Sequence, residues 1–561
     1  MIEDFKHIDP SKVNDVATLQ KILKAFMNAY ESMFGLLSAR QKEIQELRDE
    51  INRLKGEHGD LPPREDSPPS DEEKPSDEEK SDKSGDEAKD KPKRKNKNHK
   101  KGAKKPKIEI DEVVNIEIDK SILPLDAEFK YYREVVQQDI ILKRHNKLFR
   151  IPVYYSASEG KTYSGQLPEG DGGEFGAQLK AWLQLLNHYT DVTHGRLGAL
   201  MENLGLYISS GTISNILLSN TDLMVEEAQD ILRAGLEKID YAQMDGTKGL
   251  QAGVSKSTQI ISTPWYSLYY TMSSKSKADI IWALQGKPGD SVPLIYNALA
   301  KELLADSTVP KKDQKLLGEL LELDQTYSLV ELESLLAQHA PHLQSKATYP
   351  KMISALALAY YSTQNDFPRV NYLVSDAGPE YTGIANYQAL CWLHEERHYK
   401  KMTPVLKIHQ DALKHFRGQI WEFYKKLLDF KEHPPDQQQA SKEALNEEFD
   451  TIFTQKTDYF DLNDRIEKTF AKKDKLLQVL EFPDLPLHNN DAELAVRRKV
   501  RKRDISMHTM SEKGTQAQDA FMSVVETAAK LGVNAFDYLY DRITRQFNKQ
   551  SLAELIANAT I

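Results

Sequence analysis

Apolar residues near the N-terminus recur on alternating three- and four-residue steps, interrupted only at Arg40. This heptad pattern, flanked by charged residues such as Glu43, predicts a coiled coil over residues 1–56 and therefore a homo-oligomer. The alternative is a long amphipathic helix that packs on its own chain. The members of this apolar seam are Val16, Leu19, Leu23, Phe26, Tyr30, Met33, Leu37, Ile44, Leu47, Ile51 and Leu54.

The next segment, residues 57–107, is almost free of apolar side chains. Residues 65–90 hold 12 acidic residues, whereas residues 91–107 hold 10 lysines or arginines and no acid. Such a segment cannot bury enough surface to offset chain entropy, so we predict a disordered linker, acidic and then basic. Its basic half is either a solubilising tether or a contact to DNA phosphates, and both interpretations stay open.

Two units are predicted between the linker and residue 235. Residues 108–170, with Ile and Val interleaved among polar residues, predict a small β-rich unit. Residues 171–235 have a helical pattern, in which a turn at Gly205 separates two helices as in a helix-turn-helix. A structural helical hairpin would give the same pattern. The second helix, opened by Ser209, Ser210 or Thr212, holds the candidate DNA contacts Ser210, Thr212, Ser214 and Asn215.

Two strand-like segments, 239–245 and 370–376, both end in an aspartate. Ligand sites gather outside the carboxyl ends of strands in sheets with parallel pairs, so Asp245 and Asp376 can face each other across adjacent strands. Hard divalent cations such as Mg²⁺ bind to carboxylates in that arrangement.

Between these strands the sequence predicts an antiparallel pair, 257–262 and 265–272, separated at Pro264, and then a helix from Asp279. The expected order is strand, strand, strand, helix, strand. Residues 285–350 and 397–483 both have amphipathic helical patterns, which predict helical insertions beside the sheet.

A third acidic candidate, Glu493, lies in the first turn of a helix that Asn489 or Asn490 can cap. A lone carboxylate at a helix start is more often a capping partner than a ligand. Here, six of the seven residues of 497–503 are basic, so a metal ligand and a phosphate-binding surface would be neighbours. The candidate DNA-binding residues of this basic run are Arg497, Arg498, Lys499, Arg501, Lys502 and Arg503.

Composition narrows the class of protein. The 561 residues are enough for three or four domains, and the single cysteine, Cys391, excludes an intramolecular disulfide framework. No apolar run approaches the length of a membrane span and the N-terminus is acidic, so we expect a soluble, cytoplasmic protein without a membrane partner. The net charge of −10 hides the local basic runs that favour a nucleic-acid partner.

The motifs together resemble those of the insertion-sequence sixty-six family of bacterial DDE transposases, over most of the chain. LPLHNNDAE at 485–493 and FMSVVETAAKLGVNAFDYL at 521–539 look like the family's Asn-Asn-x-x-Glu motif and its following helices. VSDAGPEY at 374–381, with CWLHEER at 391–397, resembles its second-aspartate block.

This resemblance implies a multidomain α+β protein with a coiled coil, a helix-turn-helix and a ribonuclease-H-like catalytic domain. That domain would occupy 236–396, interrupted by the insertion near 285–350, and would be completed by the glutamate helix and C-terminal helices in 484–561. Asp245, Asp376 and Glu493 would bind two Mg²⁺ ions, for which Mn²⁺ can substitute, and would catalyse DNA strand cleavage and transfer. The expected partners are terminal inverted repeats, target DNA and accessory proteins of the element. The near-site residues would be Thr247, Cys391, His394, Arg397, Asn489 and Asn490.

The chain departs from the family pattern at three places. Gly246 stands where the family usually has a glutamate, and Leu494 where it has an arginine. The family tends to carry a Cys-rich zinc finger near 108–165, where this chain has no cysteine, so no zinc is expected. Cys391 and His394 have a Cys-x-x-His spacing without a second pair, and we interpret them as strand-end and near-site residues.

Two other functions remain as alternatives. One is a non-catalytic, dimeric DNA-binding protein derived from a transposase, and the other is a different ribonuclease-H-like nuclease. The enzyme is preferred because all three carboxylates are present, although fold and motif alone do not establish activity.

Overall fold

The computed structural model describes residues 15–55, 110–116, 130–166 except 134 and 141, and 174–559 except 288 and 290. The chain divides into two compact units, 1–41 with 142–561, and 42–141. The predicted linker, 57–107, lies outside the described residues. In the second unit, the described residues after the linker lie in no helix or strand. None of the described helices is long and apolar enough to cross a membrane.

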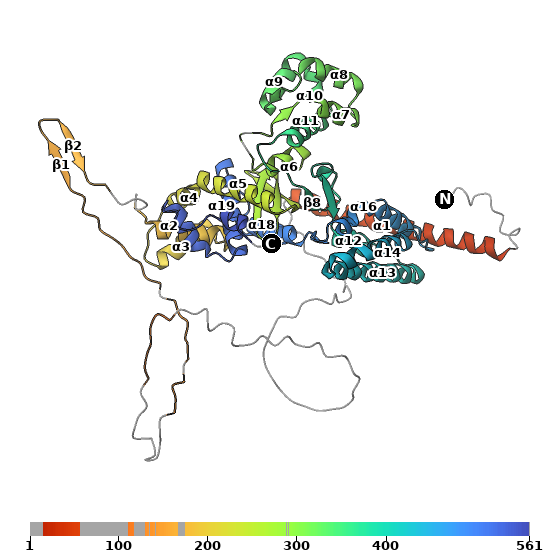
Figure 1. Ribbon diagram of the computed structural model, residues 1–561, viewed down its shortest axis with the longest axis horizontal. Helices are drawn as coiled ribbons and strands as arrows, with labels where there is room; N and C mark the ends of the chain where they lie inside the picture. The colour runs from red at the N-terminus through yellow and green to blue at the C-terminus, as the bar shows by residue number, and fades with distance from the viewer. Residues whose placement is uncertain are drawn as a thin grey trace. The chain divides into compact units, whose positions relative to one another are not determined.

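A five-stranded mixed sheet, of which Figure 1 labels β8, has the strand order β5-β4-β3-β8-β9. Antiparallel pairing joins β3, β4 and β5, whereas β8 pairs parallel to β3 and β9 pairs parallel to β8. The predicted order of three strands, a helix and a strand is confirmed. The elements are β3 (Tyr241–Gln251), β4 (Val254–Ser262), β5 (Ser267–Met272), α6 (Lys277–Leu284), β8 (Tyr372–Ser375) and β9 (Tyr387–Leu390).

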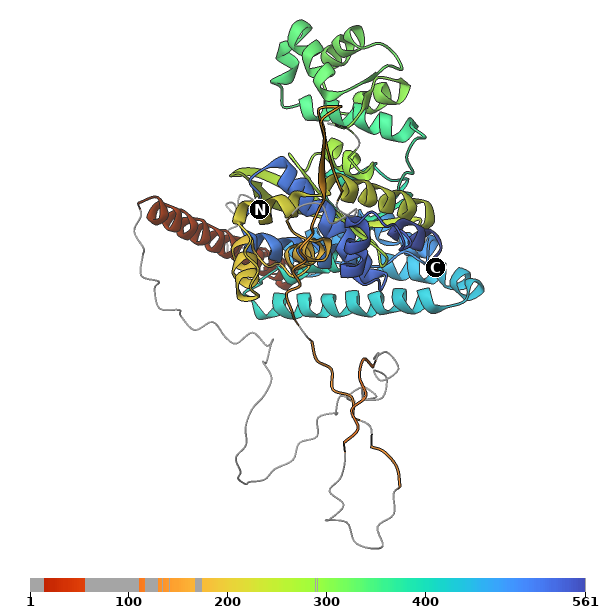
Figure 2. The ribbon, with the colours of Figure 1, turned by 90° about the vertical axis from the view of Figure 1, so that its left-hand side faces the viewer.

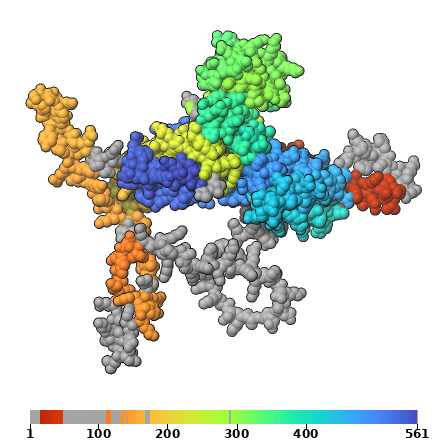
Figure 3. Space-filling model, in the orientation of Figure 1, coloured from red at the N-terminus to blue at the C-terminus, as the bar shows by residue number. Residues whose placement is uncertain are grey.

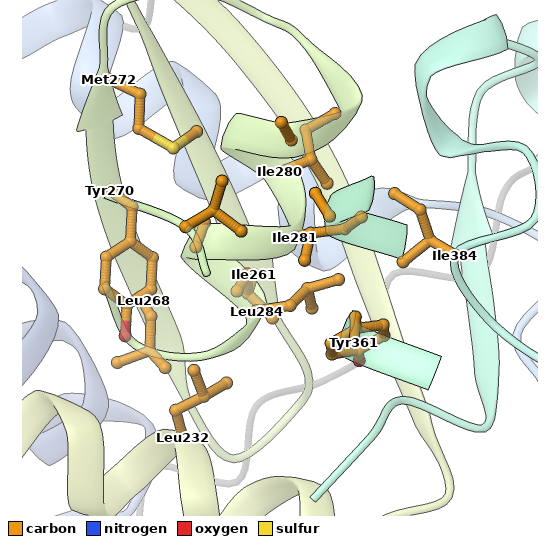
Figure 4. Packing of buried hydrophobic residues seen from close by; sticks show 14 of the residues in the cluster. Leu232, Ile261, Leu268, Tyr270, Met272, Ile280, Ile281, Leu284, Tyr361 and Ile384 are labelled. Carbon is orange, nitrogen blue, oxygen red and sulfur yellow. The ribbon is translucent and has the colours of Figure 1, made fainter. Parts of the chain in front are cut away.

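The two faces of this sheet have different coverings because alternate strand residues point to opposite sides. Ile261 and Leu268 pack in the main core with residues of α5 (Thr221–Lys238), α6 and α11 (Tyr349–Thr363), as Figure 4 shows. On the opposite face, Ile260 and Tyr269 pack against α18 (Asn490–Ser506) and α19 (Glu512–Lys530). Asp245 is in register with Ile260 and so lies on the face that α18 covers.

Both predicted insertions are helical. The buried residues of the first belong to the main core, whereas those of the second form a separate cluster rich in aromatic side chains. Figure 3 shows the first in green and the second in cyan to blue, and Figure 2 shows the length of α13. The sequence did not predict the two-residue strands β6 and β7. The first insertion contains β6 (Leu294–Ile295), α7 (Ala298–Ala305), α8 (Lys311–Leu320), β7 (Thr326–Tyr327), α9 (Leu329–His339), α10 (Pro341–Gln344) and α11. The second contains α12 (Trp392–Lys400), α13 (Lys407–Glu432), α14 (Pro435–Phe453), α15 (Phe460–Phe470), α16 (Lys473–Leu476) and α17 (Gln478–Glu481).

The predicted helical pair around Gly205 is present. Gly205 has φ +72°, a left-handed conformation that favours glycine, between α3 and α4. The Ser209 hydroxyl caps α4 by accepting a hydrogen bond from the Thr212 N–H at 3.1 Å. The helices before and after the sheet are α2 (Ala177–His188), α3 (His194–Asn203), α4 (Ser210–Leu218), α20 (Ala535–Ile543) and α21 (Leu552–Ala557).

The β structure predicted over 108–170 is limited, in the described residues, to one hairpin of β1 (Val153–Ser156) and β2 (Lys161–Ser164). Strands predicted earlier in this range are absent from its described residues. Apolar side chains there, such as Val135 and Leu148, are exposed. Alternation of apolar and polar residues does not form a sheet where no partner buries the apolar side.

The N-terminal helix, α1 (Val16–Lys55), spans the predicted apolar seam but buries an unexpected side, and residues 1–14 of the predicted 1–56 element lie outside the described residues. Its buried residues are Ala25, Asn28 and Glu31, which we call the α1 polar face. This face packs beside α13 and α15, so the helix does contact its own chain. The described residues of the apolar seam remain exposed, and whether they bind a second chain is untested by this arrangement.

Candidate active site

Strand pairing places Asp245 and Asp376 at the same level of the sheet. Gln243 pairs with Val374, and each aspartate follows two residues later. Asp376 comes directly after β8, as predicted, but the prediction that a strand ends at Asp245 is wrong, because β3 continues to Gln251 through its pairing with β4. Burial, followed by the charge of Asp376, raises the pKa of Asp245, while the Gly246 N–H, His394 and Lys275 act in the opposite direction. The two carboxylates therefore share one electrostatic environment.

The start of α18 is bound to β3 by side-chain hydrogen bonds. Asn489 donates its Nδ2 to the Met244 carbonyl at 2.7 Å. Gln243 donates to Asp491 Oδ2 at 2.6 Å and accepts from the Asp491 N–H at 3.0 Å. These bonds fix Glu493 in the first helical turn, as predicted. The expected side-chain cap is wrong: Asn489 is the N-cap residue, but its side chain bonds to the strand and not to the helix.

Glu493 points toward residues of α12. Arg397 donates its Nη2 to Glu493 Oε2 at 2.7 Å, and its Nη1 lies 3.1 Å from His394 Nε2. This hydrogen bond to Glu493 is the main cause that raises the pKa of Arg397, and the charge of Asp245 contributes as well. Arg397 therefore links Glu493 electrostatically to Asp245.

Two buried atoms at this position have no hydrogen-bond partner among the described residues. They are Glu493 Oε1 and His394 Nδ1, which lie 3.6 Å apart. Unpaired buried polar atoms are rare in folded proteins and often mark a place for an ion or ligand. Carboxylate oxygens from Asp245, Asp376 and Glu493 are hard ligands, and so this donor set fits Mg²⁺.

Cys391 also belongs to this group. It follows β9 and is the N-cap residue of α12, as expected of a strand-end residue, and its sulfur accepts from the Asn489 N–H at 3.3 Å. Burial raises the pKa of its thiol. Ligand atoms of Cys391, His394 and Glu493 all lie within 4.8 Å of one another. The Cys-x-x-His spacing could not reveal this third member, because Glu493 arrives from another helix.

The basic run of α18 is not one exposed face, because four of its six candidate DNA contacts bind groups of the protein itself. Arg498 contacts Glu526 at 2.7 Å and Asp191 at 3.2 Å. Carboxylates and carbonyl groups of elements beside α18 bind these basic side chains. The sequence of the basic run could not indicate these partners, because they come from other parts of the chain. The other three contacts join Lys499 to Asp519 at 2.7 Å, Lys502 to the Asn187 carbonyl, and Arg503 to Thr247 Oγ1 at 3.3 Å.

The remaining predicted contacts differ in exposure. Arg497 and Arg501 are exposed on α18. On α4, Ser210 and Asn215 are exposed, whereas the other two candidates are half-buried. Those two are Ser214 and Thr212, and the Thr212 hydroxyl bonds to Ser209 at 2.9 Å. Asn490 begins α18, with its N–H donated to His488 Nδ1 at 3.4 Å.

Residues 363–517 match the model of the transposase IS66 family. This stretch contains Asp376, Glu493 and the α12 residues beside them, and begins after Asp245. The match confirms the family resemblance and supports a transposase-type function.

The chain is also 29% identical over 332 residues to the uncharacterized protein y4jO of Sinorhizobium fredii (strain NBRC 101917 / NGR234). That similarity covers 58% of this chain and 98% of the relative. No solved structure matches the chain.

Proposed function

We propose that the protein is a DDE-type transposase that cleaves and transfers DNA strands at the ends of an insertion element. The observation that carries this proposal is the convergence of Asp245 and Asp376 on paired strands with Glu493 on the covering helix. Three antiparallel strands extended by two parallel ones also favour a ribonuclease-H-like domain. The family match favours a transposase over another nuclease.

Each side chain has a definite task in this proposal. Asp245, Asp376 and Glu493 would hold Mg²⁺, or Mn²⁺ in its place. Two such ions, when bound, activate water or a DNA 3′-hydroxyl and stabilise the leaving oxygen. Arg397 orients the Glu493 carboxylate through its hydrogen bond, and His394 lies beside both groups.

The same proposal includes the partners. Exposed residues of α4 and α18 would contact the terminal inverted repeats or target DNA, with phosphate contacts supplying affinity. The exposed apolar seam of α1 would pair with the seam of a second copy. Accessory proteins of the insertion element are the third class of proposed partner. A non-catalytic DNA-binding protein is the alternative, which the following experiment separates.

The test is cleavage of a labelled element-end duplex by purified protein with Mg²⁺. Asp376→Asn keeps the side-chain shape but removes a ligand charge, so cleavage should fall on the order of 100-fold or more while DNA binding persists. Asp366→Asn, the same change at an exposed residue, is the control and should cleave like the parent. Full cleavage by Asp376→Asn would contradict the proposed site, and a parent that binds but never cleaves would favour the non-catalytic alternative.

A further inference from the structure

A small basic pocket lies beside the candidate active site, between the outer half of β3, β4, the end of α18 and α19. Its volume of about 40 Å³ is room for about three waters or one tetrahedral oxyanion. α18 runs in the same direction as β3: Asp491 contacts Gln243 at one end, and Arg503 contacts Thr247 further along. One strand and one helix therefore connect the carboxylates to the pocket.

The lining of the pocket contains basic residues and no carboxylate. Lys499 is paired with Asp519, but no acidic side chain among the described residues lies within ion-pair distance of Lys256 or Lys502. The pocket therefore has a surplus of positive charge, which attracts an anion. The basic lining residues are Lys248, Lys256, Lys499, Lys502, Arg503 and His508.

Hydroxyl groups line the same pocket. Thr247, Thr258 and Thr271 are in register on three adjacent strands and face the same side of the sheet. The Ser506 hydroxyl is buried without a hydrogen-bond partner among the described residues. Hydroxyl donors beside cationic groups suit the oxygens of a phosphate. An apolar ligand would leave the Ser506 hydroxyl unpaired, whereas the threonine hydroxyls already bond to other groups of the protein.

The spacing between the pocket and the carboxylates matches the DNA backbone. Lys256 is in register with Gly249, which lies on the same face of β3 as Asp245 and four residues beyond it. Four strand residues span about 13 Å. One DNA strand presents a phosphate about every 3.4 Å along the duplex axis, and further apart through space because the phosphates also wind around it, so this span corresponds to a few nucleotides at most.

We propose that this pocket binds one backbone phosphate of the DNA strand held at the carboxylates, within a few nucleotides of the phosphodiester that is attacked. The inference rests on the proposed function, because it takes DNA as the occupant. Free inorganic phosphate has the same chemistry, and the experiment separates the two sources.

The test uses the full-length protein with Lys256→Gln and, as the matched control, Lys311→Gln at an exposed residue of α8. Binding of a labelled element-end duplex is measured against salt concentration without divalent metal. Loss of one phosphate contact should lower the slope of log affinity against log salt by about 0.9 in Lys256→Gln and leave the control slope unchanged. Lys256→Glu should lower the affinity further than Lys256→Gln.

A second readout needs no DNA. Inorganic phosphate, compared with chloride at equal ionic strength, should raise the unfolding midpoint of the parent and of Lys311→Gln more than that of Lys256→Gln. The midpoint of Lys256→Gln without phosphate checks that the variant is folded.

The outcomes separate clearly. A lower salt slope and weaker phosphate stabilisation, both confined to the Lys256 variants, support the proposal. Phosphate stabilisation that depends on Lys256, with an unchanged DNA slope, would assign the pocket to free phosphate and overturn the DNA-backbone inference. Absence of both effects would overturn it altogether. Because neither readout involves cleavage, failure of the proposed enzymatic function would be seen separately in the Asp376→Asn experiment.

Discussion

At the scale of single residues, Gly246 explains how the chain accommodates a departure from the family it resembles. A Cβ at Gly246 would lie 2.9 Å from Gln259 Nε2 and 3.1 Å from its Oε1. Gln259 is fully buried, and its Oε1 accepts a hydrogen bond from the Tyr381 hydroxyl at 3.1 Å. The amide of Gln259 thus fills the space into which a side chain at position 246 would project.

Gly246→Ala should therefore destabilise the fold by about 1–3 kcal/mol, because the buried amide of Gln259 would have to shift and strain its hydrogen bond with Tyr381. Gly249→Ala is the control in the same strand, since a Cβ there meets no atom within 4 Å. Denaturant unfolding of the two variants provides the comparison. Equal stability of both would contradict this account of position 246.

Lys502 makes stability depend on pH. Burial lowers the pKa of Lys502 to about 8, with Asp191 acting in the opposite direction and Lys499 and Arg498 adding to the effect. Between pH 8 and 10.5 the unfolded chain keeps a proton that the folded protein loses, so the free energy of unfolding rises with pH. Lys530, whose pKa burial also lowers to about 8, contributes in the same window.

Lys502→Met should accordingly reduce the rise in unfolding free energy between pH 8 and 9.5, by on the order of 1 kcal/mol. Lys513→Met, the same change at an exposed residue, should keep the rise of the parent. Urea unfolding at several pH values measures both. An identical rise in the two variants would exclude Lys502 as its source.

At the scale of elements, the α1 polar face holds the helix at the starts of two others. The Glu31 carboxylate accepts hydrogen bonds from the Val405 and Leu406 N–H groups at 2.9 and 2.6 Å, just before α13. Asn28 donates to the Asp458 carbonyl at 2.9 Å and accepts from the Phe460 N–H at 2.7 Å, at the start of α15. Helix starts favour such acceptors because their N–H groups lack partners within the helix.

Glu31→Gln should weaken this contact by about 1–2 kcal/mol, since it replaces charge-assisted hydrogen bonds by neutral ones. Faster amide hydrogen exchange over residues 15–41 would report the loss. Ser32→Ala, a change at the adjacent exposed residue, should leave exchange as in the parent. If Glu31→Gln also left it unchanged, the carboxylate would not be what holds the helix.

The apolar seam on α1 gives a prediction about assembly. Leu23→Glu combined with Leu37→Glu places charges on the seam, both at exposed residues, and should lower the oligomeric state because the seam of a second copy would have to bury them. Light scattering measures the mass of the particle. Gln20→Glu with Gln41→Glu, off the seam, is the control. An unchanged mass for the seam variant would contradict the proposed coiled coil.

At the scale of the whole molecule, α18 carries both the exposed cations proposed to bind DNA and the cations that bind other parts of the fold. Arg497→Gln with Arg501→Gln removes two exposed cations, so the slope of log DNA affinity against log salt should fall by up to about two. Arg498→Gln should instead lower stability, by about 1–3 kcal/mol, because it leaves Glu526 and Asp191 without their partner. Salt titration and thermal unfolding distinguish these effects. A change in slope for Arg498→Gln alone would reverse the assignment.

Sequence patterns predicted the features that depend on neighbouring residues in the chain, such as turns, helix caps and strands. Gly205 and the cap at Ser209 mark the helical pair, and the two strand-like segments that carry Asp245 and Asp376 predicted the pairing of β3 with β8, although β3 continues beyond Asp245. A contact between elements far apart in the chain leaves no such pattern. The group formed by Cys391 and Glu493 and the burial of Lys499 and Lys502 depend on where α18 packs. The α1 polar face escaped notice because periodicity identifies apolar faces only.

The hydrogen bond from Arg397 to Glu493 has a consequence for the order of events at the proposed site. In the proposed site, a divalent ion held by both oxygens of Glu493 would compete with the guanidinium for Oε2, so Arg397 would lower the apparent metal affinity of the free protein. A DNA phosphate is an alternative partner for the same guanidinium. Bound DNA would therefore free the Glu493 carboxylate to act as a metal ligand. Metal and DNA should therefore bind with positive cooperativity. Without DNA, the hydrogen bond from Arg397 occupies one oxygen of the proposed metal ligand Glu493.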